Sequence, residues 1–473
     1  MGKPWATFGV DLHLEPSGAG GLRRGLTDAL RDAVRGGRLA PGTRLPSSRT
    51  LAADLGIARN TVAEAYGDLV AEGWLTARQG SGTRVAMGVP PTPFGQWGRA
   101  VVPPSDTAPR RRAPGRPTHN LVPGTPDLAA FPRAEWLKTA RRALTAAPSD
   151  ALGYGDPRGR PELRTALAGY LSRARGVRAA PDGILICAGF SHGLRILGTV
   201  LRARGAHTAA VESYGLSVHW DLLTAAGLTT TPLPYDARAT DTRELPDAAA
   251  VLLTPAHQFP MGTPLRADRR AAVVDWARRT GGLVLEDDYD GEFRYDRQPV
   301  GALQGLDPDH VVYLGTASKS LAPGLRLAWM VLPPSLMEEC VAAKGLVDNC
   351  GVLDQLTLAE FITSGAYDRH VRSARLRYRR RRDTLVTALA ARAPEVRVTG
   401  IAAGLHAVLR LPPGTEPSIV QAAAWQGLAL HGLAFYRHAQ ATTEPLDALV
   451  VGYGTPPDHA WAGALEALCR VLP

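Results

Sequence analysis

From about Asn120 onward, short apolar runs alternate with longer segments in which apolar residues recur at helical spacing. Runs of strand length lie at 183–189, 208–212, 249–255, 282–288 and 310–316. Segments such as PELRTALAGYLSRARG and RADRRAAVVDWARR, between these runs, have a helical pattern. Buried parallel strands joined by crossover helices produce this alternation. The pattern predicts a large α/β unit.

After about Pro333 the pattern changes to longer helices, including the very basic stretch RHVRSARLRYRRRRDTLVTALAARAP. Short strands are predicted at GLHAVLRL and DALVVGY. These elements predict a smaller α+β subdomain at about 334–473.

The amino-terminal part has a different pattern. Apolar residues recur at helical spacing from Leu22 to Val34, and a glycine pair follows. PSS at 46–48 predicts a helix start with a hydroxyl cap, and LAADLG-IARNTVAEAY predicts a helix, a glycine turn and a second helix. GWLTARQGSGTRVA alternates around Gly80, Ser81 and Gly82. We therefore expect a winged helix-turn-helix domain over 1–86.

Residues 87–118 are rich in proline, glycine and arginine without helical or strand period, which predicts a linker. The remaining residues, 119–473, form the α/β domain with its small subdomain. A chain of 473 residues is long enough for two such domains.

The net charge of +10 and the pI near 9.7 favour a polyanionic partner, although a GC-rich genome also gives arginine-rich chains. The four cysteines lack the spacing of metal ligands, so no metal is expected. The chain also lacks the pattern of a signal peptide or a membrane helix. We expect a cytoplasmic protein.

The start of the second helix in the helix-turn-helix is polar. Residues at a recognition-helix start meet base edges and phosphates in the major groove. The predicted DNA contacts in and near the helix-turn-helix are Arg44, Ser48, Arg49, Arg59, Asn60 and Thr61. A three-helix unit of this kind is also a common structural fragment without DNA binding.

The segment LPSSRTLAADLGIARNTVAEAYGDLVAEGWLTARQGSGTRV resembles the winged-helix domain of the GntR family of bacterial regulators. The resemblance implies DNA contacts by Arg49, Arg59 and Thr61, with Gly82 at the wing tip. Ala63 stands where some relatives carry arginine, so their base preference does not transfer to this chain.

One lysine lies among small residues in GTASKSLAPGLRLAW. Burial and nearby cations lower the pKa of a lysine, and a neutral amine forms a Schiff base. Ser318 and Arg326 flank Lys319 and could hold a phosphate, so an aldehyde and a phosphate could bind together. Pyridoxal 5′-phosphate (PLP) carries both groups. A surface lysine in a loop is the structural alternative.

Two further stretches favour PLP. In GLVLEDDYDGEF, acidic residues follow an apolar strand, where a carboxylate can pair with a pyridinium nitrogen and a tyrosine two residues on can reach the phenolic oxygen. In LICAGFSHGLRIL, a strand leads through Gly189, Phe190 and Ser191 into a helix, whose amides can bind phosphate. A helix cap without a ligand is the alternative for this turn.

The whole set resembles the fold-type I aminotransferases, and specifically the MocR family of fused regulators, over nearly the entire chain. The resemblance implies that Lys319 is the internal-aldimine lysine, Asp287 pairs with the pyridine nitrogen and Tyr289 bonds the phenolic oxygen. It further implies phosphate contacts by Ser318, Arg326 and the Ser191 turn, a ring cover by Tyr214, and a contact of Tyr154 with the neighbouring subunit's phosphate.

Two departures from the aminotransferase pattern concern the substrate. Where aminotransferases carry NPTG, this chain has HQFPMG, so His257 and Gln258 are both candidates for the asparagine's contact. Val450 stands where aminotransferases carry the arginine that binds the substrate carboxylate. Arg437 is either its substitute or an ordinary surface arginine. These departures disfavour efficient transamination.

The resemblance predicts a homodimeric, PLP-dependent transcriptional regulator that reads two DNA half-sites. Its aminotransferase-like domain would sense PLP, an amine or an amino acid through aldimine chemistry at Lys319. The alternative is an active aminotransferase with an accessory DNA-binding domain.

Overall fold

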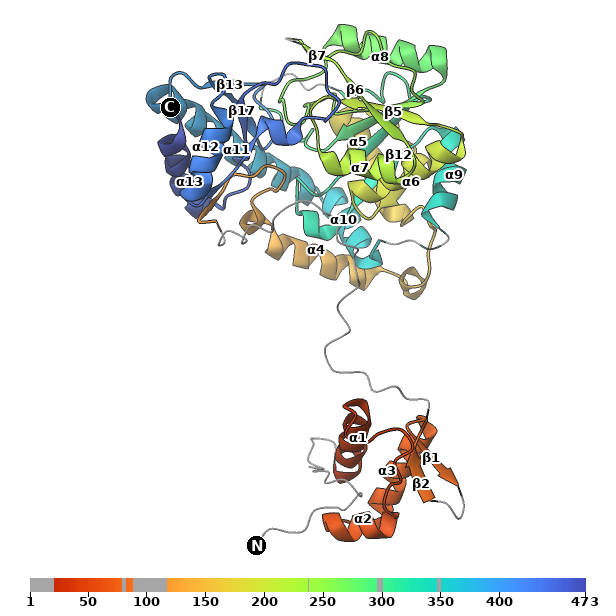
Figure 1. Ribbon diagram of the computed structural model, residues 1–473. Helices are drawn as coiled ribbons and strands as arrows, with labels where there is room; N and C mark the ends of the chain where they lie inside the picture. Colours follow the sequence, from red (N-terminus) through yellow and green to blue (C-terminus); the bar gives the residue numbers. More distant parts are fainter. Residues whose placement is uncertain are drawn as a thin grey trace. The chain divides into compact units, whose positions relative to one another are not determined.

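The computed structural model describes residues 21–78, 82–87, 117–236, 238–295, 301–345, 347 and 350–473. The chain forms two compact units, residues 1–111 and 112–473 (Figure 1). Most of the predicted linker, and Gly80 and Ser81 of the predicted wing, lie outside the described residues.

The first unit contains the predicted three helices and hairpin: α1 (Leu22–Arg35), α2 (Ser48–Leu55), α3 (Arg59–Ala71), β1 (Leu75–Arg78) and β2 (Gly82–Val85). The strands pair antiparallel, with Leu75 opposite Val85. One apolar core joins all five elements and includes Leu26, Leu51 and Leu69. Ser47 caps α2 by accepting a hydrogen bond from the Thr50 backbone amide at 3.1 Å. The winged helix-turn-helix prediction is confirmed.

The second unit is built on a seven-stranded sheet. Its strands, in spatial order, are β4 (Ile184–Cys187), β12 (Ala328–Val331), β11 (Val311–Thr316), β10 (Leu283–Asp288), β9 (Ala250–Leu253), β5 (Thr208–Glu212) and β6 (Thr229–Leu233). All pairings are parallel except those of β12, which runs antiparallel to both neighbours. The mostly parallel α/β sheet predicted from the five apolar runs is confirmed.

Helices cover both faces of this sheet. The surrounding helices are α4 (Arg133–Ala146), α5 (Pro161–Arg175), α6 (Phe190–Ala203), α7 (Ser217–Ala225), α8 (Ala267–Thr280), α9 (Pro334–Lys344) and α10 (Val352–Thr363). Successive side chains of a strand point to opposite faces. Ile186 thus packs on the face with α5 and α10, and Leu185 packs on the face with α6 and α9. Both faces are therefore apolar, as the continuous apolar runs require.

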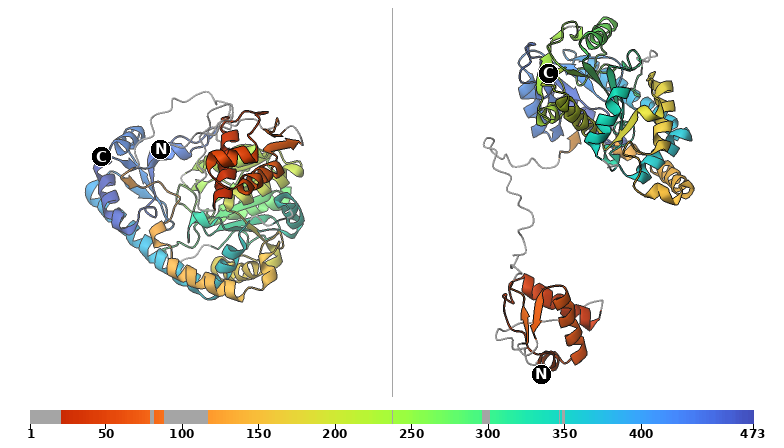
Figure 2. Two further views of the ribbon diagram at one scale, coloured as in Figure 1. Left: turned by 90° about the horizontal axis from the view of Figure 1, so that it is seen from below. Right: turned by 90° about the vertical axis from the view of Figure 1, so that its right-hand side faces the viewer.

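The small subdomain has its own sheet, in the order β13 (Arg397–Thr399), β14 (Ala407–Arg410), β17 (Ala448–Val451) and β16 (His431–Gly432). Its helices are α11 (Ala366–Arg392), α12 (Glu416–Trp425) and α13 (Asp458–Val471), which lie together and apart from α9 (Figures 1 and 2). A short strand, β3 (His119–Asn120), pairs with β15 (Leu428–Ala429). Leu121 packs into the same core, so this subdomain also includes the start of the domain.

The remaining short elements are β7 (Tyr235–Asp236), β8 (Ala239–Thr240), and the 3₁₀ turns η1 (Leu128–Ala130), η2 (Ser149–Leu152), η3 (Pro181–Gly183), η4 (Pro323–Leu325) and η5 (Leu433–Tyr436). No helix among the described residues is long and apolar enough to cross a membrane.

Candidate functional site

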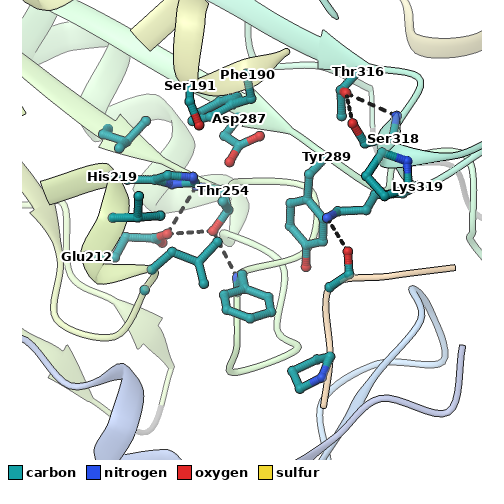
Figure 3. Close-up of a pocket in the computed structure, with 18 of the residues that line it drawn as sticks. Phe190, Ser191, Glu212, His219, Thr254, Asp287, Tyr289, Thr316, Ser318 and Lys319 are labelled. Atoms are coloured by element: carbon teal, nitrogen blue, oxygen red, sulfur yellow. Dashed lines mark hydrogen bonds between the residues drawn. The ribbon is translucent and has the colours of Figure 1, made fainter. Parts of the chain in front are cut away.

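A cavity of about 300 Å³ lies where the parallel strands of the large sheet end. Thr254 follows β9, Asp287 is the second-last residue of β10, and Thr316 ends β11. The carboxyl ends of parallel strands meet at one edge, so side chains distant in sequence converge there. Figure 3 shows Asp287, Tyr289 and Lys319 around this cavity.

Lys319 follows β11 on the turn that leads into η4. Its side chain is half-buried, and its Nζ donates a hydrogen bond to the Gly124 carbonyl at 2.5 Å. Burial lowers the pKa of Lys319, and the negative charges of Asp287 and Asp290 oppose that shift. The lowered pKa makes the neutral amine more accessible, as a nucleophilic lysine requires.

Asp287 is buried, and its Oδ1 atom has no hydrogen-bond partner among the described residues. Burial raises the pKa of Asp287 well above its usual range, while the nearby Lys319 charge opposes the rise. A buried carboxylate oxygen without a donor is costly. The Asp287 carboxylate is therefore suited to a ligand with a cationic N–H group, such as a pyridinium ring.

The start of α6 forms a cradle beside the cavity. Gly189 has a φ of 87°, and a Cβ atom there would overlap the guanidinium of Arg326. Arg326 donates from Nη2 to the Ala188 carbonyl at 2.9 Å. Phe190 and Ser191, in the first turn of α6, line the same cavity. The amides of a helix start and one guanidinium can together bind a phosphate.

Ser318 completes this side of the cavity. The Thr316 hydroxyl donates to the Ser318 Oγ at 2.8 Å and accepts from the Ser318 amide at 3.1 Å. These bonds fix the backbone and the Ser318 hydroxyl just before Lys319. The pyridine nitrogen of PLP would pair with the unpaired Asp287 oxygen, and its phosphate would lie in the cradle at Gly189. The residues present therefore fit this cofactor.

Tyr289 lies across the cavity from Phe190 (Figure 3). Burial, with the charges of Asp290 and Asp287, raises the pKa of Tyr289 well above its usual value. Its hydroxyl therefore keeps its proton and can donate a hydrogen bond. Tyr214 also lines the cavity and is fully buried.

Three other predicted residues lie elsewhere. His257 contacts Asp290 and Tyr289, and Gln258 donates to the Thr240 hydroxyl at 2.7 Å. Their neighbour Phe259 is the residue of this stretch that lines the cavity. Tyr154 is 95% exposed, and its contact with a neighbouring subunit stays a prediction.

Arg437 does not line the cavity; its Nη2 donates to the Ala441 and Thr443 carbonyls at 2.6 and 2.7 Å. Val450 is fully buried in an apolar cluster with Phe259 and Tyr436. Neither position places a free cation in the cavity.

The cavity includes groups that the sequence did not single out. Glu212, at the end of β5, accepts hydrogen bonds from the Thr254 amide and hydroxyl at 3.1 and 2.5 Å. Burial raises its pKa to about 7. The His219 ring lies 4.5 Å from the Phe190 ring, tilted by 36°, and burial lowers the pKa of His219 to about 3, so this ring is neutral. In the sequence, Glu212 could have been recognised as a cavity residue from its position at the end of an apolar strand.

On the first unit, the predicted DNA contacts lie at the surface. Arg59 and Asn60 are exposed in the first turn of α3, whose buried side packs through Val62 and Leu69. Arg49 is exposed in α2, and Ser48 and Thr61 are half-buried. Arg44 is exposed, and its guanidinium lies beside Gly82, which begins β2 with a φ of 81°.

Comparisons with known proteins agree with both units. Residues 22–85 match the model of bacterial regulatory proteins of the gntR family, and residues 120–438 match aminotransferase class I and II. The chain is 34% identical to the probable rhizopine catabolism regulatory protein MocR of Rhizobium meliloti, covering 86% of this chain and 85% of that one. The chain belongs to the MocR-type family of HTH-type transcriptional regulators.

A second relative of this MocR-type chain is the HTH-type pyridoxine biosynthesis transcriptional regulator PdxR of Corynebacterium glutamicum. The two are 33% identical, covering 94% of this chain and 95% of that one. Among solved structures, Pyrococcus horikoshii kynurenine aminotransferase has a TM-score of 0.66 at 25% identity, covering 74% of this chain and 90% of that chain. The fold-type I aminotransferase fold of the second unit is thereby confirmed.

Among the described residues, one group could hold a metal ion: His257, Asp290 and His406, with ligand atoms within 4.8 Å of one another. The His257 Nδ1 and Asp290 Oδ2 atoms are directly hydrogen-bonded at 2.8 Å, and the His406 Nε2 bonds the Pro260 carbonyl at 2.9 Å. Hydrogen bonding within the protein accounts for these atoms.

Proposed function

We propose that this regulator binds PLP at Lys319 and changes its affinity for DNA when PLP, or an amine that reacts with it, occupies the cavity. The observation that carries the proposal is the unpaired, buried Oδ1 of Asp287 in the same cavity as Lys319. Bound PLP supplies an aldehyde that condenses with the lysine amine, releasing water, and that can exchange this nitrogen for an effector's amine.

The chain's own residues would hold the cofactor at three points. Asp287 accepts from the ring nitrogen, and Tyr289 donates to the phenolic oxygen. Arg326, Ser318 and the first amides of α6 bind the phosphate. Lys319 is then the residue whose bond to the cofactor an effector amine would replace. Release of Lys319 is the change that the protein would sense.

The effector is an amine or PLP itself rather than an α-amino acid that needs an arginine clamp. Of the described residues that line the cavity, Lys319 and Arg326 are those with a side-chain cation, and Arg326 is assigned to the phosphate. Arg437 is bound to backbone carbonyls, and Val450 is buried. An effector carboxylate would therefore lack a partner within this chain's cavity.

On DNA, the winged helix would insert the first turn of α3 into the major groove. We propose a homodimer in which two winged helices read two half-sites, because paired half-sites need paired domains. An effector shifts DNA binding only if its affinity differs between the two arrangements of the dimer.

An active aminotransferase is the second candidate, because Lys319, Asp287 and Tyr289 all surround one cavity. The positions of Arg437 and Val450 count against efficient turnover of amino acids.

The absorption spectrum of the purified protein with PLP, recorded before and after each of a panel of amines and amino acids, tests the proposal. A stable spectral change with one compound and no released keto acid supports the sensor. Conversion of the cofactor with keto acid release supports the enzyme. A spectrum identical to that of free PLP would contradict both.

A further inference from the structure

His257 and Asp290 form a buried pair behind Tyr289. The His257 Nδ1 lies 2.8 Å from Asp290 Oδ2 and 3.1 Å from the Tyr289 hydroxyl oxygen. His257 and Asp290 are both nearly inaccessible, with exposed side-chain fractions of 2%. Neither residue lines the cavity, whereas Tyr289 does.

One nitrogen atom of His257 therefore faces two oxygen atoms. A carboxylate only accepts hydrogen bonds, so the contact with Asp290 places the hydrogen on Nδ1. That N–H then also points at the Tyr289 oxygen, which accepts from it. Since Nδ1 already carries a hydrogen, the tyrosine cannot donate its own proton there.

The Tyr289 proton must therefore point away from Nδ1, either toward Asp290, whose carboxylate also interacts with this hydroxyl, or toward the cavity. Tyr289 retains this proton, because burial and the charges of Asp290 and Asp287 raise its pKa well above the usual value. The Asp290 Oδ2 atom already accepts from His257, which leaves the cavity that Tyr289 lines as the direction for this proton. Phe259 packs edge-on against the Tyr289 ring, with centroids 5.9 Å apart at 90°, and limits its rotation.

The surroundings keep the pair in this arrangement. Gly404, with a φ of 72°, lies so close that a Cβ there would overlap the His257 ring and the Asp290 carboxylate. The His406 ring is 5.1 Å from that of His257 and is held through its Nε2 by the Pro260 carbonyl. Burial lowers the pKa of His406 to about 4, so this neighbour adds no positive charge near neutral pH.

We propose that His257 and Asp290 are positioning residues that aim the Tyr289 hydroxyl proton into the cavity, at the phenolic oxygen of the cofactor. The inference rests on the proposed binding of PLP at Lys319. It assigns His257 a role through Tyr289 instead of the direct cofactor contact considered from the sequence. It assigns Asp290, which the sequence did not single out, the choice of the histidine tautomer.

The consequence is measurable in the cofactor's absorption. A hydrogen bond donated to the phenolic oxygen stabilises its negative charge, so the proton shared with the Lys319 nitrogen is lost at a lower pH. Removing the donor therefore raises the midpoint of the pH-dependent absorbance change. His257→Leu should shift this midpoint upward by roughly one pH unit, in the direction of Tyr289→Phe.

The experiment records absorbance against pH for the full-length, PLP-loaded wild type, His257→Leu, Tyr289→Phe and the double variant. If His257 acts through Tyr289, adding His257→Leu to Tyr289→Phe causes no further shift. His310→Leu is the matched control, because His310 forms a similar pair with Asp307, at 3.1 Å, away from the cavity. It should leave the midpoint unchanged.

Two conservative variants keep the test decisive if His257→Leu does not fold. His257→Asn retains an N–H donor and should stay near the wild-type midpoint, whereas Asp290→Asn weakens the choice of tautomer and should shift it upward. An unchanged midpoint in both His257→Leu and Asp290→Asn, or a further shift in the double variant, would overturn the inference. Failure of the wild type to bind PLP would instead contradict the proposed function.

Discussion

Asp287 and Lys319 face the same cavity, and the charge of each opposes the pKa shift of the other. Burial raises the pKa of Asp287 and lowers that of Lys319, and their mutual attraction partly restores both. The pair thus places a carboxylate and an amine, both partly desolvated, in the lining of one cavity. A ligand with a cationic ring nitrogen and an aldehyde matches both groups at once.

The first prediction concerns the covalent bond at Lys319. Lys319→Ala removes the amine, so borohydride reduction in the presence of PLP should add the cofactor mass to the wild-type peptide but not to the variant. Peptide mass spectrometry measures this directly. Lys138→Ala, at an exposed lysine on α4, is the control and should retain the label at Lys319. Labelling of another lysine in place of Lys319 would refute the assignment.

The second prediction concerns the phosphate cradle. In Gly189→Ala the new methyl group displaces the Arg326 guanidinium, and the positive φ adds strain. The Kd for PLP, measured by absorbance titration, should rise by roughly tenfold, equivalent to about 1.4 kcal/mol. Gly169→Ala in α5 is the matched control, because its Cβ meets no atom within 4 Å. Equal Kd values for the two variants would contradict the cradle.

The third prediction concerns DNA. Arg59→Ala should weaken binding to a duplex selected from random sequence and lower the slope of log K against log salt by about 1 if the residue contacts a phosphate. Fluorescence anisotropy at several salt concentrations gives both quantities. The cofactor spectrum should not change. Arg24→Ala, an exposed arginine on α1, is the control. Wild-type affinity in Arg59→Ala would show that α3 does not enter the groove as proposed.

The fourth prediction concerns pH and stability. Burial, with the charge of Asp288, raises the pKa of Glu292 to about 7, so the folded chain retains a proton that the unfolded chain loses near its ordinary pKa of about 4.3. The native state then binds more protons between these values, and the free energy of unfolding falls as pH rises through this window.

Glu292→Gln stays neutral and should remove this part of the slope. Relative to wild type, its free energy of unfolding should therefore increase by on the order of 3 kcal/mol from about pH 4.5 to 7. Urea unfolding at pH 5, 6 and 7 measures the difference. The exposed Glu338→Gln is the control. A constant difference between Glu292→Gln and wild type across this range would contradict the assigned shift.

Much of the fold followed from local patterns. Five buried strands have continuous apolar runs, so β4, β5, β9, β10 and β11 were predictable. The edge strand β6 contains threonines and Pro232, which weaken the strand signal. The antiparallel direction of β12 and the pairing of β3 with β15 depend on contacts between distant segments. No local pattern contains that information.

In the site too, local patterns were predictable and contacts between distant segments were not. Asp287, Tyr289 and Lys319 stand at strand ends and in motifs that resemble a known family, so the sequence singled them out. The His257–Asp290 contact joins loops after two different strands, and its meaning depends on which nitrogen faces which oxygen. The backbone contacts of Arg437 likewise could not be read from the sequence, which left its role open.

The proposed function requires that occupancy of the PLP cavity changes the affinity for DNA. The most direct test measures the affinity of the full-length protein for its selected DNA with and without PLP, for wild type and Lys319→Ala. PLP should change the DNA affinity of the wild type by roughly 5- to 150-fold, the usual range of allosteric coupling, and should leave that of Lys319→Ala unchanged. The same DNA affinity with and without PLP in the wild type, under conditions where its spectrum shows bound cofactor, would contradict it.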